Sequence, residues 1–389
     1  MTRPPHSAPA ATRVLVTDGE FKHTLGIVRD LADAGHEVHP LARSGRAPAA
    51  HSRSVHAWHA ASAAGAAFDQ RLLEVAARLA PVSVLPVGSA SMAAADRLRD
   101  RWPDGVRIAI APPAAFATAN RKDATAAVAR AAGVDTPRER VVASAAEARA
   151  ALAEFGAPIV LKSSREEGVK ALRYVRDPAQ ADAAFEQVRA LSADAVLAQE
   201  YVRGPGWGFS GLWWHGRRVR AFMHRRVREW PPSGGTSAAA DSVPRCEPLD
   251  RAGAAVLDAL GWHGVAMVEF KGDPASRLVL MEVNAKFWGS HDVALAGGVR
   301  FPSDLVALLE GAVLPPQAPV EPVRFTWPLG GDLWHGLARP AALPRVLWDA
   351  VAPGVHHSGR LDDPLPHLYE LAQWARSTPG ALREAARLR

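Results

Sequence analysis

Gly264-Val-Ala-Met-Val-Glu-Phe270 and Leu278-Val-Leu-Met-Glu-Val-Asn284 are two apolar stretches that each carry acidic or amide side chains near the end. Both predict β-strands, and the turn residues between them predict a hairpin. Side chains alternate between the two faces of a strand, so Glu282 and Asn284 fall on one face. If the strands pair, Glu269 shares that face with them, among aliphatic neighbours.

Glu269, Glu282 and Asn284 are the predicted metal ligands of this hairpin. A carboxylate beside buried aliphatic side chains is costly unless it is paired or binds a cation. Magnesium prefers oxygen ligands and usually takes one or two carboxylates together with substrate phosphates. We therefore predict Mg²⁺, with Mn²⁺ as a substitute. The alternative is that local lysines or backbone groups satisfy these polar residues, and the order of the other signals along the chain favours the metal.

The bulk composition narrows the class of protein. The chain has 389 residues, 48% hydrophobic and 22% charged, which predicts a soluble globular protein of more than one domain. A single cysteine, Cys246, excludes an internal disulfide framework and favours the cytoplasm. The sequence contains no apolar run long enough to span a membrane, so we expect no membrane span. The net charge of +6 comes without a long basic run or zinc-finger spacing. We therefore expect phosphate- or carboxylate-bearing small substrates and no nucleic acid.

The N-terminal part predicts a Rossmann-like α/β domain over residues 13–115, after a flexible tail at residues 1–12 that lacks the features of a signal peptide. The expected strands are 13–17, 37–41 and 82–86, and the expected helices are 24–34 and 68–79. The glycine fingerprint of a dinucleotide site is missing after the first strand, so a nicotinamide oxidoreductase is disfavoured.

The following part, residues 116–325, predicts a mixed α+β domain. Expected helices are 120–132, 147–154, 180–191, 249–260 and one from 304 to 310; expected strands are 158–162 and 195–202, with a hairpin over 209–230 that turns at 215–216. Residues 231–244 are rich in Pro, Gly and Ser and predict a long loop. The extension at 326–389 predicts a late helix near 365–375.

Two strand ends in this domain suit a nucleotide. Lys162 ends an apolar strand before Glu166-Glu167-Gly168 and can place an ammonium group on phosphate oxygens. A snorkelling surface lysine is the alternative. Glu200, at the end of another strand, can present backbone and carboxylate to adenine, although alone it is also compatible with an exposed acid.

A basic hairpin precedes the predicted loop. Arg225, Arg226 and Arg228 lead into a turn that contains Gly234 and Gly235, and their guanidinium groups suit a phosphoryl group or a carboxylate. The turn also contains Ser237, and its amides and hydroxyls suit an anion. A solvated strand face remains the alternative.

The order of these elements resembles the ATP-grasp superfamily, in particular the carbamoyl-phosphate-synthase-like carboxylate–amine ligases, over roughly residues 13–320. The motifs that carry the resemblance are Lys122-Asp123, Lys162, Gln199-Glu-Tyr-Val-Arg-Gly204, Arg225 with Pro-Pro-Ser-Gly-Gly235, Glu269 and Glu282-Val-Asn284-Ala-Lys286-Phe-Trp-Gly-Ser290. The resemblance implies a Rossmann-like domain, a lid at about 130–204 and a C-terminal mixed sheet. It also implies transfer of the ATP γ-phosphate to a carboxylate and attack by an amine, so the expected partners are small-molecule acids and amines.

The resemblance also implies site roles. Lys122 and Lys162 would hold phosphates; Glu200, Tyr201 and Val202 would hold adenine; Arg225, Arg228 and Lys286 would be catalytic; and Arg226, Gly234, Gly235, Ser237 and Ser290 would contact substrate. Two positions depart from the family pattern. Trp207 stands where many members carry an acid for ribose, and Lys286 replaces an arginine, which keeps the charge and loses the bidentate fork.

Alternatives to a ligase stay open at this point: a kinase-type enzyme that phosphorylates a small substrate, and a non-catalytic nucleotide-binding module. In the extension at 326–389, four tryptophans are expected to pack on the core: Trp327, Trp334, Trp348 and Trp374. A role for this extension in substrate binding or in a homodimer is the other interpretation. His291-Asp292 is a weaker candidate for substrate contact.

Overall fold

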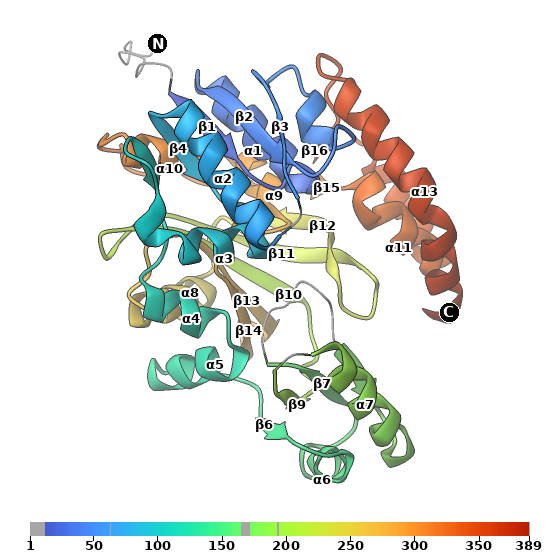
Figure 1. Ribbon diagram of the computed structural model, residues 1–389. Helices are drawn as coiled ribbons and strands as arrows, with labels where there is room; N and C mark the ends of the chain where they lie inside the picture. The colour runs from blue at the N-terminus through green and yellow to red at the C-terminus, as the bar shows by residue number, and fades with distance from the viewer. Residues whose placement is uncertain (1–11, 63, 165–171, 193, 389) are drawn as a thin grey trace. The chain divides into compact units, whose positions relative to one another are not determined.

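The computed structural model describes residues 12–62, 64–164, 172–192 and 194–388 (Figure 1). The predicted tail up to residue 11 and the loop Glu166-Glu167-Gly168 lie outside these residues. The chain divides into two compact units. The first comprises Met1–Ile110, Arg226–Ser242 and Phe287–Arg389, and the second comprises Ala111–Arg225 and Val243–Lys286.

A parallel sheet forms the centre of the first unit, in the order β3-β2-β1-β4-β5. Its strands are β1 (Arg13–Val16), β2 (Glu37–Ala42), β3 (His59–Ala60), β4 (Val82–Leu85) and β5 (Val106–Ile108), and the helices among them are α1 (Lys22–Asp33), η1 (Pro48–His51), α2 (Ala66–Leu79), α3 (Ser89–Arg97) and η2 (Arg99–Arg101). This order confirms the predicted doubly wound topology.

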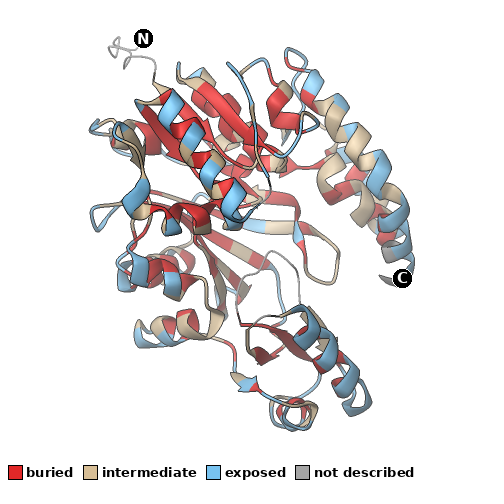
Figure 2. Ribbon diagram, viewed as in Figure 1, coloured by how far each residue is buried: buried red, intermediate tan, exposed pale blue. Residues whose placement is uncertain are grey.

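The core of this sheet follows from its apolar strands. Leu15 and Val82 are fully buried, and α2 covers them with Phe68, Leu72 and its other apolar side chains. Figure 2 shows the outer surface of α2 exposed and the strands beneath it buried. The apolar periodicity of the helix therefore selects the face that packs on the sheet.

The C-terminal part of the chain, Phe287–Arg389, belongs to the same unit and includes the extension at 326–389. Its elements are α9 (His291–Ala296), α10 (Phe301–Leu309), β15 (Arg324–Thr326), η4 (Pro328–Asp332), α11 (Leu333–Ala338), η5 (Pro340–Ala342), α12 (Leu343–Asp349), β16 (Val355–His357) and α13 (Leu365–Leu388). Arg29 of α1 forms a buried ion pair with Asp363 at 2.8 Å. Ser52 donates a hydrogen bond to the same carboxylate at 2.6 Å. These contacts tie the segment before α13 to α1 and to the end of η1.

The second unit contains an antiparallel sheet in the order β6-β9-β7-β8. Its strands are β6 (Glu139–Val142), β7 (Ile159–Ser163), β8 (Leu172–Val175) and β9 (Val196–Glu200), and its helices are α6 (Ala145–Phe155), η3 (Pro178–Gln180) and α7 (Ala181–Leu191). Both α6 and α7 contribute buried residues to one apolar cluster with these strands.

A larger sheet has the order β14-β13-β10-β11-β12-β15-β16. In the second unit it contains β10 (Gly206–Trp214), β13 (Gly264–Asp273), β14 (Arg277–Asn284) and most of β11 (Arg217–Trp230), with the helices α4 (Pro113–Ala119), α5 (Lys122–Ala131) and α8 (Glu247–Ala259). The last residues of β11 and the strand β12 (Thr236–Ser242) belong to the first unit. Strand β11 thus contributes to both units.

The predicted hairpin over 209–230 is confirmed. Strands β10 and β11 pair antiparallel, and the turn residues His215 and Gly216 both have positive φ, 48° and 73°. Two-residue turns with this geometry match the right-handed twist of the flanking strands.

Two expectations are wrong. The predicted loop at 231–244 contains β12, which pairs antiparallel with β15. Its alanines, including Ala239, are fully buried. Alanine has little intrinsic β-propensity, so the strand is stabilised by packing against its neighbours and not by its own sequence. Trp348 is 59% exposed and does not pack on the core, whereas Trp327 is 2% exposed as expected.

Among the described residues, no helix is long and apolar enough to cross a membrane. The late helix, expected near 365–375, begins at Leu365 and continues to Leu388. Trp374 on this helix stacks on Trp334 of α11, with 6.3 Å between the ring centroids. The aromatic contact explains how α13 is held against α11.

Arg228 provides a stability test for the first unit. Its guanidinium donates to Asp332 at 2.6 and 2.8 Å and to Asp349 at 2.8 Å, and all three side chains are buried. We predict that Arg228→Met lowers the free energy of unfolding by about 3–5 kcal/mol, because it leaves Asp332 buried without its partner. Equilibrium urea unfolding of the full chain measures this.

Arg218→Met is the matched control. Arg218 pairs with Asp250 at 2.9 Å on the surface, where its side chain is 42% exposed. An exposed pair contributes less than about 1 kcal/mol. Equal losses for the two variants would contradict the structural role of Arg228.

Candidate functional site

The acidic hairpin places its two glutamates opposite each other. In the β13–β14 register Glu269 pairs with Glu282, and a bulge follows Glu269. Asn284 donates from Nδ2 to Glu269 Oε1 at 3.1 Å. Like charges directly across a sheet destabilise it unless cations or donors compensate them. The shared face predicted for the three residues is therefore present, and it needs positive charge nearby.

Lys122 supplies part of that charge. It is the first residue of α5, and its Nζ lies 3.5 Å from Glu282 Oε2. Its backbone amide donates to the carbonyl of Ser164 at 2.8 Å, just after β7. The lysine side chain is 14% exposed, so a ligand could reach it.

Lys162 lies deeper than Lys122. It is 6% exposed, and its Nζ donates to Gln199 Oε1 at 3.0 Å. Gln199 in turn donates to Glu139 Oε2 at 2.7 Å. Burial, helped by the nearby charge of Lys122 and opposed by Glu139 and Glu282, lowers the pKa of Lys162 to about 8. Sequence reasoning missed Glu139 and gave no role to Gln199, although Gln199 directly precedes the predicted adenine residue.

Glu200 ends β9 between two arginines. Arg138 donates to its Oε2 at 2.9 Å and Arg277 to its Oε1 at 2.8 Å. Burial alone would raise the pKa of Glu200, but the hydrogen bonds from Arg277 and Arg138 outweigh it and hold the pKa below the ordinary value. Each oxygen of this carboxylate thus already accepts a hydrogen bond from an arginine.

The residues after Glu200 have aromatic and apolar surroundings. Tyr201 meets Tyr174 of β8 edge to face at 5.8 Å, and Lys271 Nζ lies 5.2 Å from the Tyr201 ring centroid. Val202 is 9% exposed. Trp207, at the position of the missing ribose acid, donates from its indole to the Gly272 carbonyl at 2.9 Å, so it anchors the end of β13.

The predicted arginines have different surroundings. Arg225 is exposed in the second unit, opposite Trp207 in the β10–β11 register. Arg226 in the first unit lies 3.1 Å from Glu229 and 3.4 Å from the Gly235 carbonyl. Arg228 is held by Asp332 and Asp349, as described above, and this favours a structural role for it. Lys286 is half-buried, two residues after Asn284.

The glycine turn is shaped by backbone crowding. A Cβ on Gly235 would lie 1.9 Å from the Trp230 carbonyl oxygen, and Gly234 has a φ of 131°. Ser237 is buried, and its carbonyl accepts a hydrogen bond from Lys22 at 2.7 Å. Ser290 is also buried, immediately before α9. These residues are therefore placed by the fold of the first unit.

Lys22 is a candidate that sequence reasoning missed. It begins α1, directly after the first strand and its turn, where ligands bind in open α/β sheets. Its Nζ lies 4.1 Å from the Trp327 ring centroid. Burial lowers the pKa of Lys22 to about 8; Asp292 opposes this shift and Arg226 adds to it. The position after the first strand was the available sequence signal.

The oxygen donors of the acidic hairpin differ from an ordinary cluster of metal-binding side chains. Among the described residues, no group of three or more His, Cys, Asp or Glu side chains could hold a metal. Glu269, Glu282 and Asn284 offer two carboxylates and one amide instead. This set fits Mg²⁺, which completes its coordination with substrate phosphates and water.

Comparison with solved structures identifies the architecture. Biotin carboxylase from Campylobacter jejuni matches at a TM-score of 0.66 and 15% identity, over 80% of this chain and 74% of that chain. The biotin carboxylase domain of 2-oxoglutarate carboxylase from Hydrogenobacter thermophilus, solved with MgADP and bicarbonate, matches at 0.65 and 15%, over 80% and 72%. N5-carboxyaminoimidazole synthetase from Staphylococcus aureus, solved with ADP, matches at 0.64 and 13%, over 80% and 81%.

The chain has the ATP-grasp fold. Its parallel N-terminal sheet, small antiparallel sheet and larger mixed sheet match the ATP-grasp architecture. No protein-family model matches the chain. The fold expected from the sequence is thus confirmed, and the roles of individual site residues remain predictions.

The buried lysine of this ATP-grasp fold gives a pH prediction. The folded protein loses the Lys162 proton above about pH 8, while an unfolded lysine keeps it until about pH 10.5. The unfolded state then binds more protons, so this residue makes stability rise with pH between these values. In Lys162→Met that contribution disappears.

We expect the stability of wild type relative to Lys162→Met to increase from pH 7.5 to 9.5, measured by urea unfolding without nucleotide. Lys271→Met serves as the control, because Lys271 lies outside the Gln199–Glu139 contacts and should leave the slope unchanged. A constant difference between wild type and Lys162→Met would contradict the burial argument.

Proposed function

We propose that this protein is an ATP-dependent ligase that activates a small carboxylic acid as an acyl phosphate and joins it to an amine. The observation that carries the proposal is the cluster within the second unit, where Glu269, Glu282 and Asn284 share one strand face beside Lys122. Lys162 adds a second ammonium group that interacts electrostatically with Glu282. Acidic ligands and lysines together suit a metal-bound polyphosphate.

Each group in the cluster has a proposed task. Lys122 and Lys162 hold the phosphate oxygens of ATP, and the negative phosphates favour the charged form of Lys162 despite its burial. Backbone groups of Tyr201 and Val202 bind adenine. Glu269, Glu282 and Asn284 would hold magnesium, which neutralises phosphate charge when bound. Positioning and charge stabilisation are what phosphoryl transfer requires.

The reaction proceeds in two balanced steps. A carboxylate oxygen attacks the γ-phosphorus, the bond from that phosphorus to the β–γ bridging oxygen breaks, and ADP leaves. The amine nitrogen then attacks the acyl carbon, the bond between that carbon and the phosphate oxygen breaks, and inorganic phosphate leaves. The nitrogen releases one proton, and an amide remains. Exposed Arg225 and half-buried Lys286 are the proposed cations for the transferred phosphate and the substrate carboxylate.

The residues of the first unit complete the proposal. Arg226, Ser237 and Ser290, with the Gly234-Gly235 turn, are the proposed substrate contacts, and Lys22 joins them because it binds the Ser237 carbonyl. The guanidinium of Arg228 already donates to Asp332 and Asp349. Its proposed contribution is therefore indirect, because it fixes the position of β11. A homodimer also stays a prediction; the Hydrogenobacter domain was described as a dimer.

Glu282→Gln tests the metal assignment. The change keeps the size of the side chain and removes the charge that a magnesium ion requires. We expect kcat for acid-dependent ADP release to fall at least about 100-fold, with a higher magnesium concentration at half-maximal rate. Glu247→Gln, on the exposed start of α8, is the control and should behave as wild type. Unchanged turnover in Glu282→Gln would overturn the assignment.

An isotope experiment tests the acyl phosphate. An acid that supports ADP release is labelled with ¹⁸O in its carboxylate and incubated with ATP, magnesium and an amine. Transfer of one ¹⁸O atom to inorganic phosphate, together with an amide mass, is the expected result, because the acyl carbon–oxygen bond breaks in the second step. A stable phosphorylated product would instead indicate a kinase, and nucleotide binding without turnover across a broad panel would indicate a non-catalytic module.

A further inference from the structure

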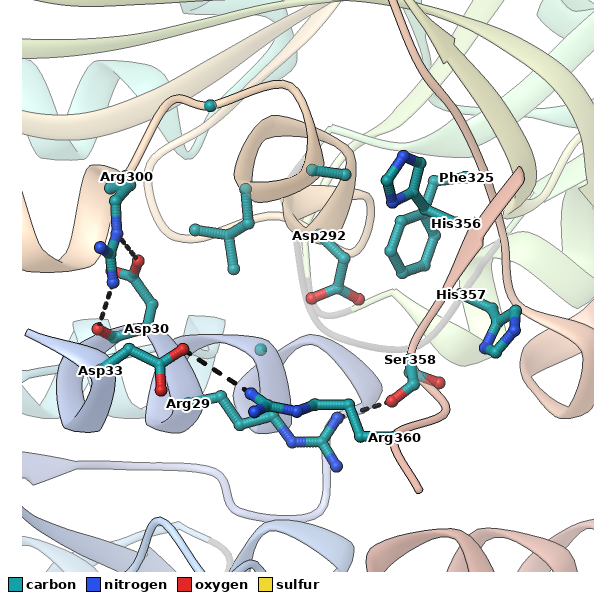
Figure 3. Close-up of a pocket in the computed structure, with 14 residues that line it drawn as sticks. Arg29, Asp30, Asp33, Asp292, Arg300, Phe325, His356, His357, Ser358 and Arg360 are labelled. Atoms are coloured by element: carbon teal, nitrogen blue, oxygen red, sulfur yellow. Dashed lines mark hydrogen bonds and ion pairs between the residues drawn. The ribbon is translucent and has the colours of Figure 1, made fainter. Parts of the chain in front are cut away.

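A cavity of about 500 Å³ lies within the first unit, among α1, α9 and the segment that follows β16 (Figure 3). Its wall includes Gly26 and Arg29 of α1, Asp292 of α9, His357 and Arg360. The lining contains neither the acidic hairpin nor the lysines proposed to hold ATP. Its volume falls in the usual range for small-molecule sites, about 300–1,000 Å³.

Asp292 gives this cavity a buried acceptor. The side chain is 4% exposed, and its Oδ2 accepts a hydrogen bond from the Trp327 indole at 2.8 Å. Its Oδ1 has no hydrogen-bond partner within the part of the chain that the structure describes. Figure 3 shows the carboxylate directed toward the space above α1. A buried carboxylate oxygen without a donor is costly, so this atom favours a ligand that donates a hydrogen bond.

The structure keeps room for that oxygen. A Cβ on Gly26 would lie 2.1 Å from Asp292 Oδ1, so only glycine fits beneath it on α1. Burial raises the pKa of Asp292 to about 6, and the Trp327 hydrogen bond and Lys22 limit the rise. The group is therefore mainly ionised at neutral pH, which suits a cationic donor.

The charges around the cavity restrict the ligand further. Arg29 pairs with Asp363 at 2.8 Å and Arg300 with Asp30 at 2.6 Å. Arg360 pairs with Asp362 at 3.0 Å and with Asp33 at 3.6 Å. A ligand that carried only a positive charge would be repelled by these guanidinium groups as it approached Asp292. A ligand with both an ammonium group and an anionic group matches both kinds of charge.

We propose that this cavity binds a small zwitterion of the α-amino-acid class, whose ammonium group donates to Asp292 Oδ1 and whose carboxylate lies toward Arg360 and His357. The exposed edge formed by His357 and Arg360 lets the carboxylate keep part of its hydration. The proposal concerns a site separate from the ATP cluster and does not depend on the ligase activity.

Asp292→Asn tests the proposed contact. The amide oxygen can still accept from Trp327, while the amide nitrogen replaces Oδ1 and cannot accept from an ammonium group. Calorimetry without nucleotide would measure binding of a panel of the common L-amino acids to the full chain. We expect at least one to bind wild type and its Kd to rise at least about tenfold in Asp292→Asn. Its decarboxylated amine and its deaminated acid should each bind more weakly than the amino acid.

Ala296→Leu is the second variant, because it narrows the cavity from α9 without changing Asp292. It should also weaken binding, and it decides the question if Asp292→Asn fails to fold by circular dichroism. Asp104→Asn, on an exposed loop of the same unit, is the control and should bind as wild type. The proposal is overturned if no amino acid binds, if the cavity variants bind as wild type, or if the amine without a carboxylate binds equally well. Because no ATP is present, none of these results bears on the ligase proposal.

Discussion

The register that sets Glu269 opposite Glu282 is the constraint on which the candidate site depends. Two carboxylates held across a hairpin repel each other, and the fold compensates them with the Asn284 amide and the Lys122 ammonium group. A one-residue slip of β14 would turn Glu282 to the other face and break this set. The bulge after Glu269 and the apolar side chains on both strands hold the register, so packing and site chemistry reinforce each other.

Periodicity and strand ends were enough to predict much of the fold. The βαβ opening, the hairpin turning at His215-Gly216 and the acidic hairpin all come from local patterns, and the structure contains each of them. Strand β12 was missed because an alanine-rich segment becomes a strand only when its neighbours bury it. Trp348 was misplaced because the size of an aromatic side chain does not say which side of its helix meets the core.

The partners of the candidate residues could not be predicted in the same way. Arg228 contacts Asp332 and Asp349, which lie 104 and 121 residues further along the chain, and no local pattern links them. Lys22 meets the Ser237 carbonyl across 215 residues. The oxygens of Glu200 accept hydrogen bonds from Arg138 and Arg277, and no local pattern in the sequence places these arginines beside it. Sequence patterns therefore gave the kinds of residue in the site, whereas their charge balance depends on long-range contacts.

The path of the chain through the two units has a consequence for biosynthesis. The first unit needs residues from Met1–Ile110, from Arg226–Ser242 and from Phe287–Arg389, whereas the second is complete at Lys286. The ribosome synthesises the chain from its N-terminus. The second unit can therefore fold before α9, β15 and the C-terminal helices, which complete the first unit, have been synthesised. Arg29 forms its buried ion pair with Asp363, which is among the last residues to be translated. The nascent N-terminal sheet therefore exposes apolar surface longest, which makes it the part of the chain most open to chaperones and to aggregation.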